Sequence, residues 1–134
     1  MMIYKSSTDK ILKIDHQIDW ERLTHAIHMV ETGGKNGPVL GDSGNALGPL
    51  QIHRSYYVDS RTPGSYNQVA DLRYATKVYR NYMRRYATAS RLGRVPTAQD
   101  VARIHNGGPN GYKKSSTIKY WNKVRKYYES SSSL

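Results

Sequence analysis

A glycine-rich segment between two helical patterns is the feature that most limits the folds open to this chain. Residues 33–51 contain six Gly and two Pro, and both residue types interrupt helices, Gly through its backbone freedom and Pro through its missing N–H. Within this segment, Val39-Leu40 and Leu50-Gln51-Ile52 have the length of short strands and flank the turn Gly41–Asn45. We therefore expect a small β-hairpin platform inserted into a helical chain.

Helical spacing marks the chain on both sides of this platform. Trp20, Leu23, Ile27 and Val30 recur at the spacing of one helix face and predict a first helix that Asp19 caps and Gly33-Gly34 ends. Further along, we expect a helical turn at 55–58, a long helix over 67–89, a short helix capped by Thr97 with Asp100 as capping-box partner, and a last helix capped by Ser116 that buries Ile118, Trp121, Val124 and Tyr128. The predicted fold class is α+β, mainly α, with about five helices.

The length of 134 residues favours one domain with one core. We expect an N-terminal arm over 1–14, a folded domain over 15–128 and a disordered Ser-rich tail over 129–134. No stretch has the apolar length of a membrane span, and the first residues have no apolar run of signal-peptide length. The chain has no Cys, which excludes disulfides, thiol nucleophiles and Cys-based metal sites.

The net charge of +11 indicates polyanionic partners, among them nucleic acid, anionic membrane and the bacterial cell wall. Residues 74–94 interleave basic and aromatic side chains, which is typical of a nucleic-acid surface. The same pattern also describes an amphipathic helix with a packed Tyr stripe and a solvated basic face, and we favour this second interpretation. The charge would then draw the protein to an anionic wall.

Glu31 is the first candidate for chemistry because it lies in the last turn of the first predicted helix. The negative end of the helix dipole disfavours an ionised carboxylate there, and burial beside Ile27 and Val30 acts in the same direction. Both effects favour the protonated carboxyl that a general acid must supply. The alternative is an ordinary surface Glu at a helix end.

Asp42 follows 11 residues later in the Gly-rich turn. A ligand can approach a carboxylate among glycines closely, and backbone N–H groups there keep it ionised. A protonated Glu and an ionised Asp across a cleft are the groups that cleave a glycosidic bond. The alternative is an Asp that only shapes the turn.

Several segments, taken in order, resemble the invertebrate-type lysozymes over roughly residues 20–125. The segments are Val30-Glu31-Thr32-Gly33, Gly41-Asp42-Ser43-Gly44-Asn45-Ala46-Leu47-Gly48-Pro49-Leu50-Gln51-Ile52, Ile104-His105-Asn106-Gly107-Gly108-Pro109-Asn110-Gly111 and Tyr120-Trp121. That family is rich in cysteine, whereas this chain has none. The missing cysteines and signal are compatible with a phage endolysin.

The resemblance implies a lysozyme-like fold in which 15–128 form a muramidase domain that hydrolyses the β-1,4 bond between N-acetylmuramic acid and N-acetylglucosamine. Glu31 would be the general acid, and Asp42 the nucleophile or the stabiliser of the oxocarbenium ion. The substrate-binding residues it implies are Gln51, His53, His105, Asn106 and Gly107. We expect a monomer that acts on peptidoglycan at the bacterial wall and needs no cofactor.

The histidines could also be ligands of a metal ion. His25, His28 and Glu31 have a spacing that places them on adjoining turns of one helix. One exposed and one packed His explain the same pattern, and we therefore expect no metal.

Two rival functions remain open on the sequence. A lytic transglycosylase uses the same Glu without the Asp and leaves a 1,6-anhydro sugar end. A non-catalytic basic module would bind wall glycan or nucleic acid.

Overall fold

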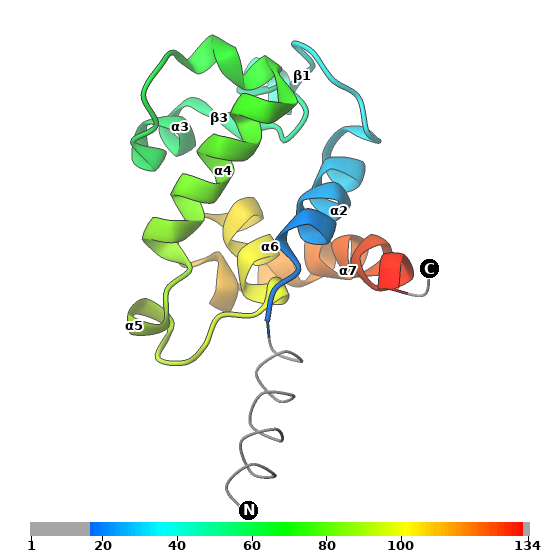
Figure 1. Ribbon diagram of the computed structural model, residues 1–134, viewed down its shortest axis with the longest axis vertical. Coiled ribbons are helices and arrows are strands. Elements are labelled where there is room, and N and C mark those ends of the chain that lie inside the picture. The colour runs from blue at the N-terminus through cyan, green and yellow to red at the C-terminus, as the bar shows by residue number, and fades with distance from the viewer. Residues whose placement is uncertain (1–16, 133–134) are drawn as a thin grey trace, which may run out of the picture.

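The computed structural model describes residues 17–132, so the expected arm over 1–14 and His16 lie outside the described residues. Its elements, traced in Figure 1, follow one another along the chain. They are α2 (Trp20–Thr32), β1 (Leu40–Gly41), the 3-10 helix η1 (Asp42–Gly44), β2 (Ala46–Leu47), β3 (Ile52–His53), α3 (Arg54–Ser60), η2 (Tyr66–Ala70), α4 (Leu72–Tyr86), α5 (Ala89–Leu92), α6 (Ala98–Gly107), η3 (Gly111–Lys113), η4 (Ser115–Thr117) and α7 (Ile118–Ser132).

The mainly α class with a small β platform is confirmed: the described residues form six α-helices and one three-stranded sheet. In Figure 1 the sheet and α3 lie at one end of the molecule, α4 runs down from them, and α2, α6 and α7 gather at the other side. In the part of the chain that is described, no helix is long and apolar enough to cross a membrane.

The platform has one strand more than the sequence predicted. β2 lies between β1 and β3 in an antiparallel sheet, and Ala46 pairs with Gly41 on one side and with His53 on the other. Ala46-Leu47 carries no alternating pattern long enough to mark a strand, so its pairing depends on its two neighbours. The register places Gly41 and His53 on opposite sides of Ala46, close to the turn that holds Asp42.

The long helix predicted over 67–89 is wrong as one element: it is divided into η2, α4 and α5. Asp71 adopts an extended backbone, with φ −93° and ψ 128°, and its carboxylate accepts a hydrogen bond from Tyr74 N. Thr88 caps α5 in the same way, through Arg91 N. Both residues are N-cap types that compete with helix continuation, and the hydrophobic period across them conceals the breaks.

Local capping of α2 and α6 agrees with the sequence. Asp19 caps α2 through Arg22 N, and Gly33 ends that helix in the left-handed conformation. Thr97 and Asp100 form the expected capping box of α6, which Arg94 reinforces with two hydrogen bonds of 2.6 and 2.8 Å to the buried carboxylate.

The last helix differs from its expected pattern at both ends. Val124 is fully buried, but Ile118 is 46% exposed, and Thr117 is buried one residue earlier. A 3-10 turn at Ser115–Thr117, which contains the expected cap Ser116, precedes the helix. The expected disordered tail begins too early, because α7 continues through Ser132; residues 133–134 lie outside the described part.

The core lies between α2, α4 and α6 and is built from aliphatic residues and tyrosines. Fully buried members include Leu23, Ile27, Tyr79 and Ile104. Tyr56 and Tyr82 stack with ring centroids 3.7 Å apart, which joins α3 to α4. Tyrosine thus supplies the aromatic packing in a chain that has no Phe.

Substitution of Gly48 tests how closely the platform packs against the rest of the fold. Both Gly48 and Gly44 have left-handed φ values, 84° and 88°. A Cβ at Gly48 would collide with the backbone carbonyl of Val69, whereas a Cβ at Gly44 meets nothing within 4 Å. We expect Gly48→Ala to lower the free energy of unfolding by about 1–3 kcal/mol more than Gly44→Ala. Urea unfolding of both variants measures the difference, and equal losses would contradict the close approach.

Candidate active site

Glu31 lies in the last turn of α2 with its side chain 18% exposed. The Tyr120 hydroxyl of α7 donates a 2.7 Å hydrogen bond to Oε2 of this carboxylate. His105 Nε2 of α6 lies 3.4 Å from the same oxygen. Three helices therefore converge on one atom of Glu31, and its orientation is set by residues far from it in the sequence.

His105 is held from both ends of its imidazole, and only 2% of its side chain is exposed. Nε2 lies 3.0 Å from the Leu50 carbonyl oxygen, and Nδ1 lies 2.8 Å from the Tyr56 hydroxyl. A carbonyl oxygen only accepts hydrogen bonds, so in the neutral ring Nε2 carries the proton and Nδ1 accepts from Tyr56. This tautomer directs an N–H toward both Leu50 and Glu31 Oε2.

The two tyrosines of this cluster remain neutral donors at ordinary pH. Burial, together with the Glu31 charge and its hydrogen bond, raises the pKa of Tyr120 well above its usual range. Burial also raises the pKa of Tyr56, and the neighbouring Tyr79 and Tyr82 add to the effect. Both hydroxyls therefore keep the proton that their hydrogen bonds require.

Asp42 follows β1 and has a strained backbone for a residue with a side chain. Its φ of 51°, and that of Ser43 at 56°, lie in the left-handed region, which Asp tolerates better than most residues. The side chain is 64% exposed, and its Oδ2 lies 3.2 Å from His53 Nε2. The contact crosses the sheet in the direction that the Gly41–Ala46–His53 register sets up.

One pocket of about 350 Å³ brings both candidate carboxylates together. Its lining residues are Glu31, Asp42, Ala46, Gln51, His53, His105 and Asn106. Four of the five expected substrate-binding residues therefore lie on the wall of a pocket that also contains Glu31 and Asp42. The lining residues of the pocket come from α2, η1, the β platform and α6. The pocket therefore lies between the platform and the helices.

Two expected residues have structural contacts that the sequence did not predict. The Gln51 amide donates to the carbonyl oxygens of Val39 and Gly48, at 3.1 and 3.0 Å, and so braces the platform while lining the pocket. Gly107 is not among the lining residues; a Cβ there would collide with Thr117, and its carbonyl accepts from Lys114 Nζ at 2.7 Å.

Sequence reasoning missed the roles of Tyr120 and Tyr56. Tyr120 stands in the Tyr120-Trp121 pair of the family-like pattern, but nothing local indicates that its hydroxyl reaches a carboxylate 89 residues away. Tyr56 is one of twelve tyrosines in the chain, and no local signal separates it from the rest.

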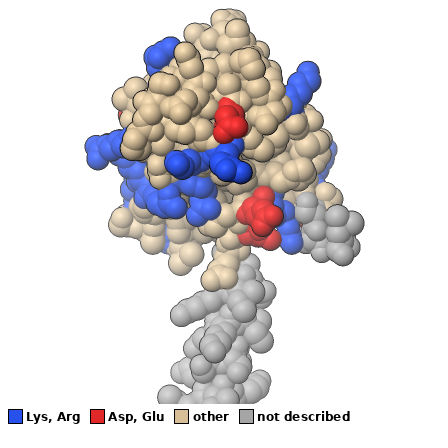
Figure 2. Space-filling view, turned by 45° about the horizontal axis from the view of Figure 1, so that its top comes forward, with Lys and Arg blue, Asp and Glu red and all other residues tan. Residues whose placement is uncertain are grey.

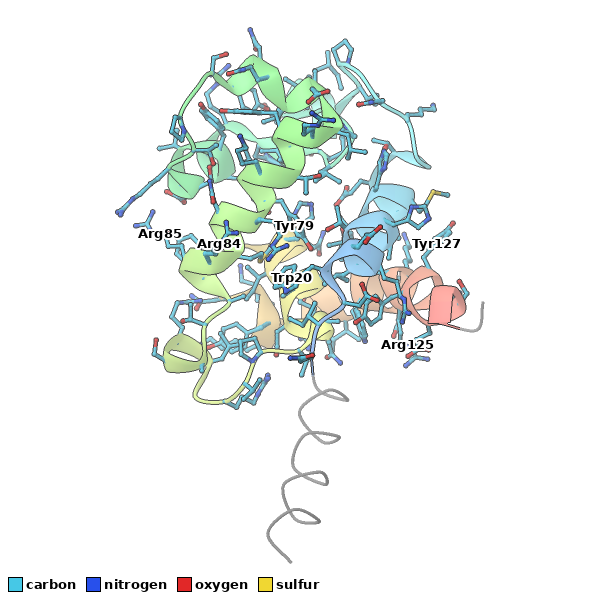
Figure 3. The ribbon with its side chains drawn as sticks, viewed as in Figure 1. Trp20, Tyr79, Arg84, Arg85, Arg125 and Tyr127 are labelled. Carbon is cyan, nitrogen blue, oxygen red and sulfur yellow. The ribbon has the colours of Figure 1, made fainter. Side chains whose placement is uncertain are left out.

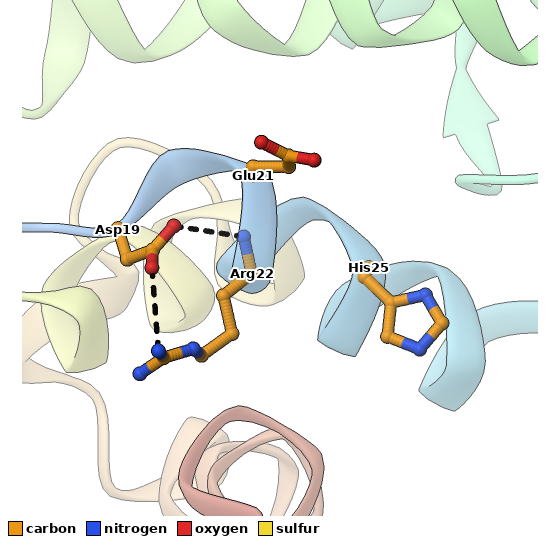
Figure 4. Close-up of a pocket in the computed structure, with 4 residues that line it drawn as sticks. All are labelled: Asp19, Glu21, Arg22 and His25. Carbon is orange, nitrogen blue, oxygen red and sulfur yellow. Dashed lines mark hydrogen bonds and ion pairs between the residues drawn. The ribbon is translucent and has the colours of Figure 1, made fainter. Parts of the chain in front are cut away.

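His25 and His28 of α2 do not form a cluster with Glu31. His28 is buried, and its Nε2 lies 2.7 Å from the Lys35 carbonyl oxygen, beyond the end of the helix. His25 is exposed and lines a separate pocket of about 270 Å³ with Asp19, Glu21 and Arg22 (Figure 4). Within residues 17–132, no three His, Asp or Glu side chains are grouped as metal ligands.

Comparison with known proteins finds one family model, Destabilase, that matches residues 23–127. A lysozyme of Meretrix lusoria is 38% identical over 109 residues, which are 79% of this chain and 88% of that protein. A lysozyme of Ostrea edulis is 40% identical over 82 residues, 60% of this chain and 58% of its own length. Invertebrate-type lysozyme 3 of Caenorhabditis elegans is 35% identical over 112 residues, 75% of this chain and 81% of the relative.

Solved structures agree with the sequence matches. The Meretrix lusoria lysozyme in complex with Aeromonas hydrophila PliI has a TM-score of 0.70 and 38% identity, and the match covers 78% of this chain and 87% of that one. The Tapes japonica lysozyme has a TM-score of 0.69 and 30% identity, with 81% and 89% covered. The lysozyme-like fold expected from the sequence is confirmed.

The raised pKa of Tyr120 predicts a loss of stability in alkali. Unfolded Tyr releases its proton near pH 10, whereas folded Tyr120 keeps it, so the free energy of unfolding falls as pH rises above about 10. One such group contributes a slope of up to about 1.4 kcal/mol per pH unit. We expect Tyr120→Phe to reduce this slope. Glu31→Gln should reduce it less, because burial is the main cause. Urea unfolding between pH 8.5 and 11 measures all three; a slope unchanged in Tyr120→Phe would refute the assignment.

Proposed function

Because this chain belongs to the Destabilase family and is a lysozyme of the invertebrate type, we propose that Glu31 and Asp42 are the catalytic pair with which it hydrolyses the glycan strands of bacterial peptidoglycan. Family membership makes it a glycoside hydrolase of the muramidase class. The bond to be cut is the β-1,4 linkage between N-acetylmuramic acid and N-acetylglucosamine.

The observation that carries the proposal is the single pocket that Glu31 and Asp42 line together. Glu31 is mostly buried and fixed by two donors, whereas Asp42 is exposed and lies on a Gly-rich turn. A glycosidase needs these two different environments, because one carboxyl must deliver a proton while the other remains charged.

Glu31 is suited to act as the acid through its Oε1 atom. Tyr120 and His105 both approach Oε2, and among residues 17–132 no hydrogen bond is made to Oε1. Two donors at Oε2 leave Oε1 as the atom that carries the acidic proton. Glu31 Oε1 would protonate the leaving glycosidic oxygen and then accept a proton from the water that completes hydrolysis.

Asp42 would act on the opposite side of the sugar. As the bond breaks, positive charge develops at the anomeric carbon, and an ionised carboxylate there either attacks it or stabilises it. His53 lies against Oδ2 and so leaves Oδ1 for the anomeric carbon. Gly41 and Gly44 on either side of the turn carry no side chains that would hinder the approach of a sugar to this carboxylate.

Gln51, His53, Asn106 and Gly107 would hold the N-acetyl sugars around this pair, the first three from the pocket wall and Gly107 through its loop. We assign His105 a positioning role, because its ring is buried and both nitrogens already have partners. The catalytic domain would comprise the expected residues 15–128 together with the end of α7, which continues through Ser132. It would act as a monomer on the bacterial wall, and the positive charge would favour its approach.

Replacement of Glu31 tests the acid. Glu31→Gln keeps the size of the side chain but cannot donate a carboxylic proton, so we expect lysis of wall suspensions to fall by about 10²-fold or more. Glu21→Gln on the same helix is the matched control, since Glu21 is exposed and lines a different pocket. Turbidity clearing measures both, and activity of Glu31→Gln within a few-fold of wild type would end the assignment.

Replacement of Asp42 tests the mechanism. Asp42→Asn removes the charge that faces the anomeric carbon, and we expect a loss of at least about 10²-fold in rate. Asp71→Asn is the control, because Asn caps a helix as well as Asp does. Masses of the released muropeptides complete the test: wild-type products should contain the added water. Full activity of Asp42→Asn with 1,6-anhydro ends would instead indicate a transglycosylase.

A further inference from the structure

A stripe of four basic side chains runs along the outer face of α4. Arg73, Lys77, Arg80 and Arg84 succeed one another at spacings of four, three and four residues, which on an α-helix confines them to an arc of about 60° over a length of about 16 Å. The buried residues of α4, among them Val78 and Tyr82, lie on the opposite side. Figure 2 shows Lys and Arg side chains gathered together on one face, and Figure 3 labels Arg84 on α4.

This stripe has no acidic partners within the described part of the chain. The ion pairs of Arg in residues 17–132 involve Arg22, Arg94 and Arg125, all outside α4. The sequence of α4 contains no Asp or Glu at all. Each pair of like charges three or four residues apart destabilises a helix by about 0.2–0.5 kcal/mol, so the arrangement is unfavourable unless an opposite charge neutralises it.

Arg80, in the middle of the stripe, is held in place by its contacts. Its guanidinium lies 4.0 Å from the centre of the Trp20 ring, and its Nε is buried without a hydrogen-bond partner. Burial lowers the pKa of Arg80, and the charge of Arg84 lowers it further. Trp20 is in turn packed edge-on against the buried Tyr79 (Figure 3). The middle of the stripe is therefore fixed on the core of the protein.

We propose that this basic stripe binds a phosphodiester polymer of the bacterial wall, of the poly(glycerol phosphate) type. The proposal rests on the proposed function, which brings the protein to a wall where such polymers are attached to peptidoglycan. A row of cations at regular spacing fits a chain with one phosphate in every repeat. Arginine forks bind phosphate oxygens through paired hydrogen bonds.

The face favours this partner over single-stranded nucleic acid. Nucleic-acid surfaces of that kind add exposed aromatic rings on which bases stack. Here Tyr79 and Tyr82 of α4 are buried, and the Trp20 ring is covered by Arg80. The stripe thus offers charge without a stacking platform.

The stripe is also separate from the catalytic pocket. The lining of that pocket includes no residue of α4, so a polymer on the stripe leaves the glycan site accessible. The two sites together would hold the enzyme on the wall between successive cleavages.

The test measures binding in a catalytically inactive chain, so that it does not depend on lysis. In the Glu31→Gln background, the stripe variant carries Arg73→Gln, Lys77→Gln and Arg84→Gln; Arg80 is kept because it packs on Trp20. The control variant carries Lys119→Gln, Lys123→Gln and Lys126→Gln, which removes three exposed charges at similar spacing from α7. The probes are soluble poly(glycerol phosphate), random duplex DNA, and Gram-positive walls before and after chemical removal of the polymer.

We expect the stripe variant to bind poly(glycerol phosphate) at least about tenfold more weakly at 0.15 M salt, and the slope of log K against log salt to fall by about 2. The control variant should lose less than threefold, and stripped walls should bind the parent chain more weakly than intact walls. Equal loss in both variants would overturn the proposed surface. Equal binding to stripped walls, or equal affinity for duplex DNA, would overturn the proposed partner.

A separate measurement distinguishes this proposal from the proposed function. With Glu31 intact, the stripe variant should cleave polymer-free peptidoglycan at the wild-type rate within twofold. A large loss there would show that the stripe supports the fold or the catalytic site, and would overturn a role confined to wall polymer. Failure of Glu31 as the acid would leave the binding results unaffected.

Discussion

The buried imidazole of His105 is the contact on which the arrangement of the catalytic pocket depends. It joins the Leu50 carbonyl of the platform, the Tyr56 hydroxyl of α3 and the Glu31 carboxylate of α2 to its own helix, α6. Because a carbonyl can only accept, this set of partners selects one tautomer and directs its N–H toward Glu31. Loss of the ring would take this partner from the Leu50 carbonyl and the Tyr56 hydroxyl and leave Glu31 Oε2 with Tyr120 alone, which is costly in a low-dielectric interior.

Tyrosine and threonine hold the platform in place in a chain without cysteine. The Tyr66 hydroxyl donates a 2.6 Å bond to the Ile52 carbonyl, and Thr32 Oγ1 donates a 3.0 Å bond to the Pro49 carbonyl. Tyr56 stacks on Tyr82. Invertebrate-type lysozymes are otherwise rich in cysteine, and a disulfide acts mainly by restricting the unfolded chain. Here hydrogen bonds and ring packing in the folded state attach the Gly-rich segment to the helices.

The charged side chains of this protein form two different arrangements, one in the catalytic pocket and one on α4. In the pocket, acidic and imidazole groups are paired closely, as Asp42 is with His53 and Glu31 with His105. On α4, four cations follow one another with no acid in the helix. The first arrangement fixes the direction of single side-chain atoms. The second produces a field that acts on a polymer over many ångströms and weakens as salt is added.

The sequence by itself determined the features that arise within a few residues of one another. The caps Asp19 and Thr97, the Gly33 end of α2 and the position of Glu31 in its last turn follow from local propensities. The spacing of the motifs around Asp42 and His105 indicated the family. These features need no knowledge of distant contacts, because helix ends and turns are selected by the side chains next to them.

Only the tertiary structure decided which distant groups surround the two carboxylates. The hydroxyl of Tyr120 reaches Glu31 across 89 residues of chain, and Tyr56 reaches His105 across 49. The strand Ala46-Leu47 exists because β1 and β3 lie on either side of it, and Thr117 is buried in place of Ile118. Such outcomes depend on how whole elements pack against one another, and hydrophobic periodicity specifies the buried face of a helix but not its partner.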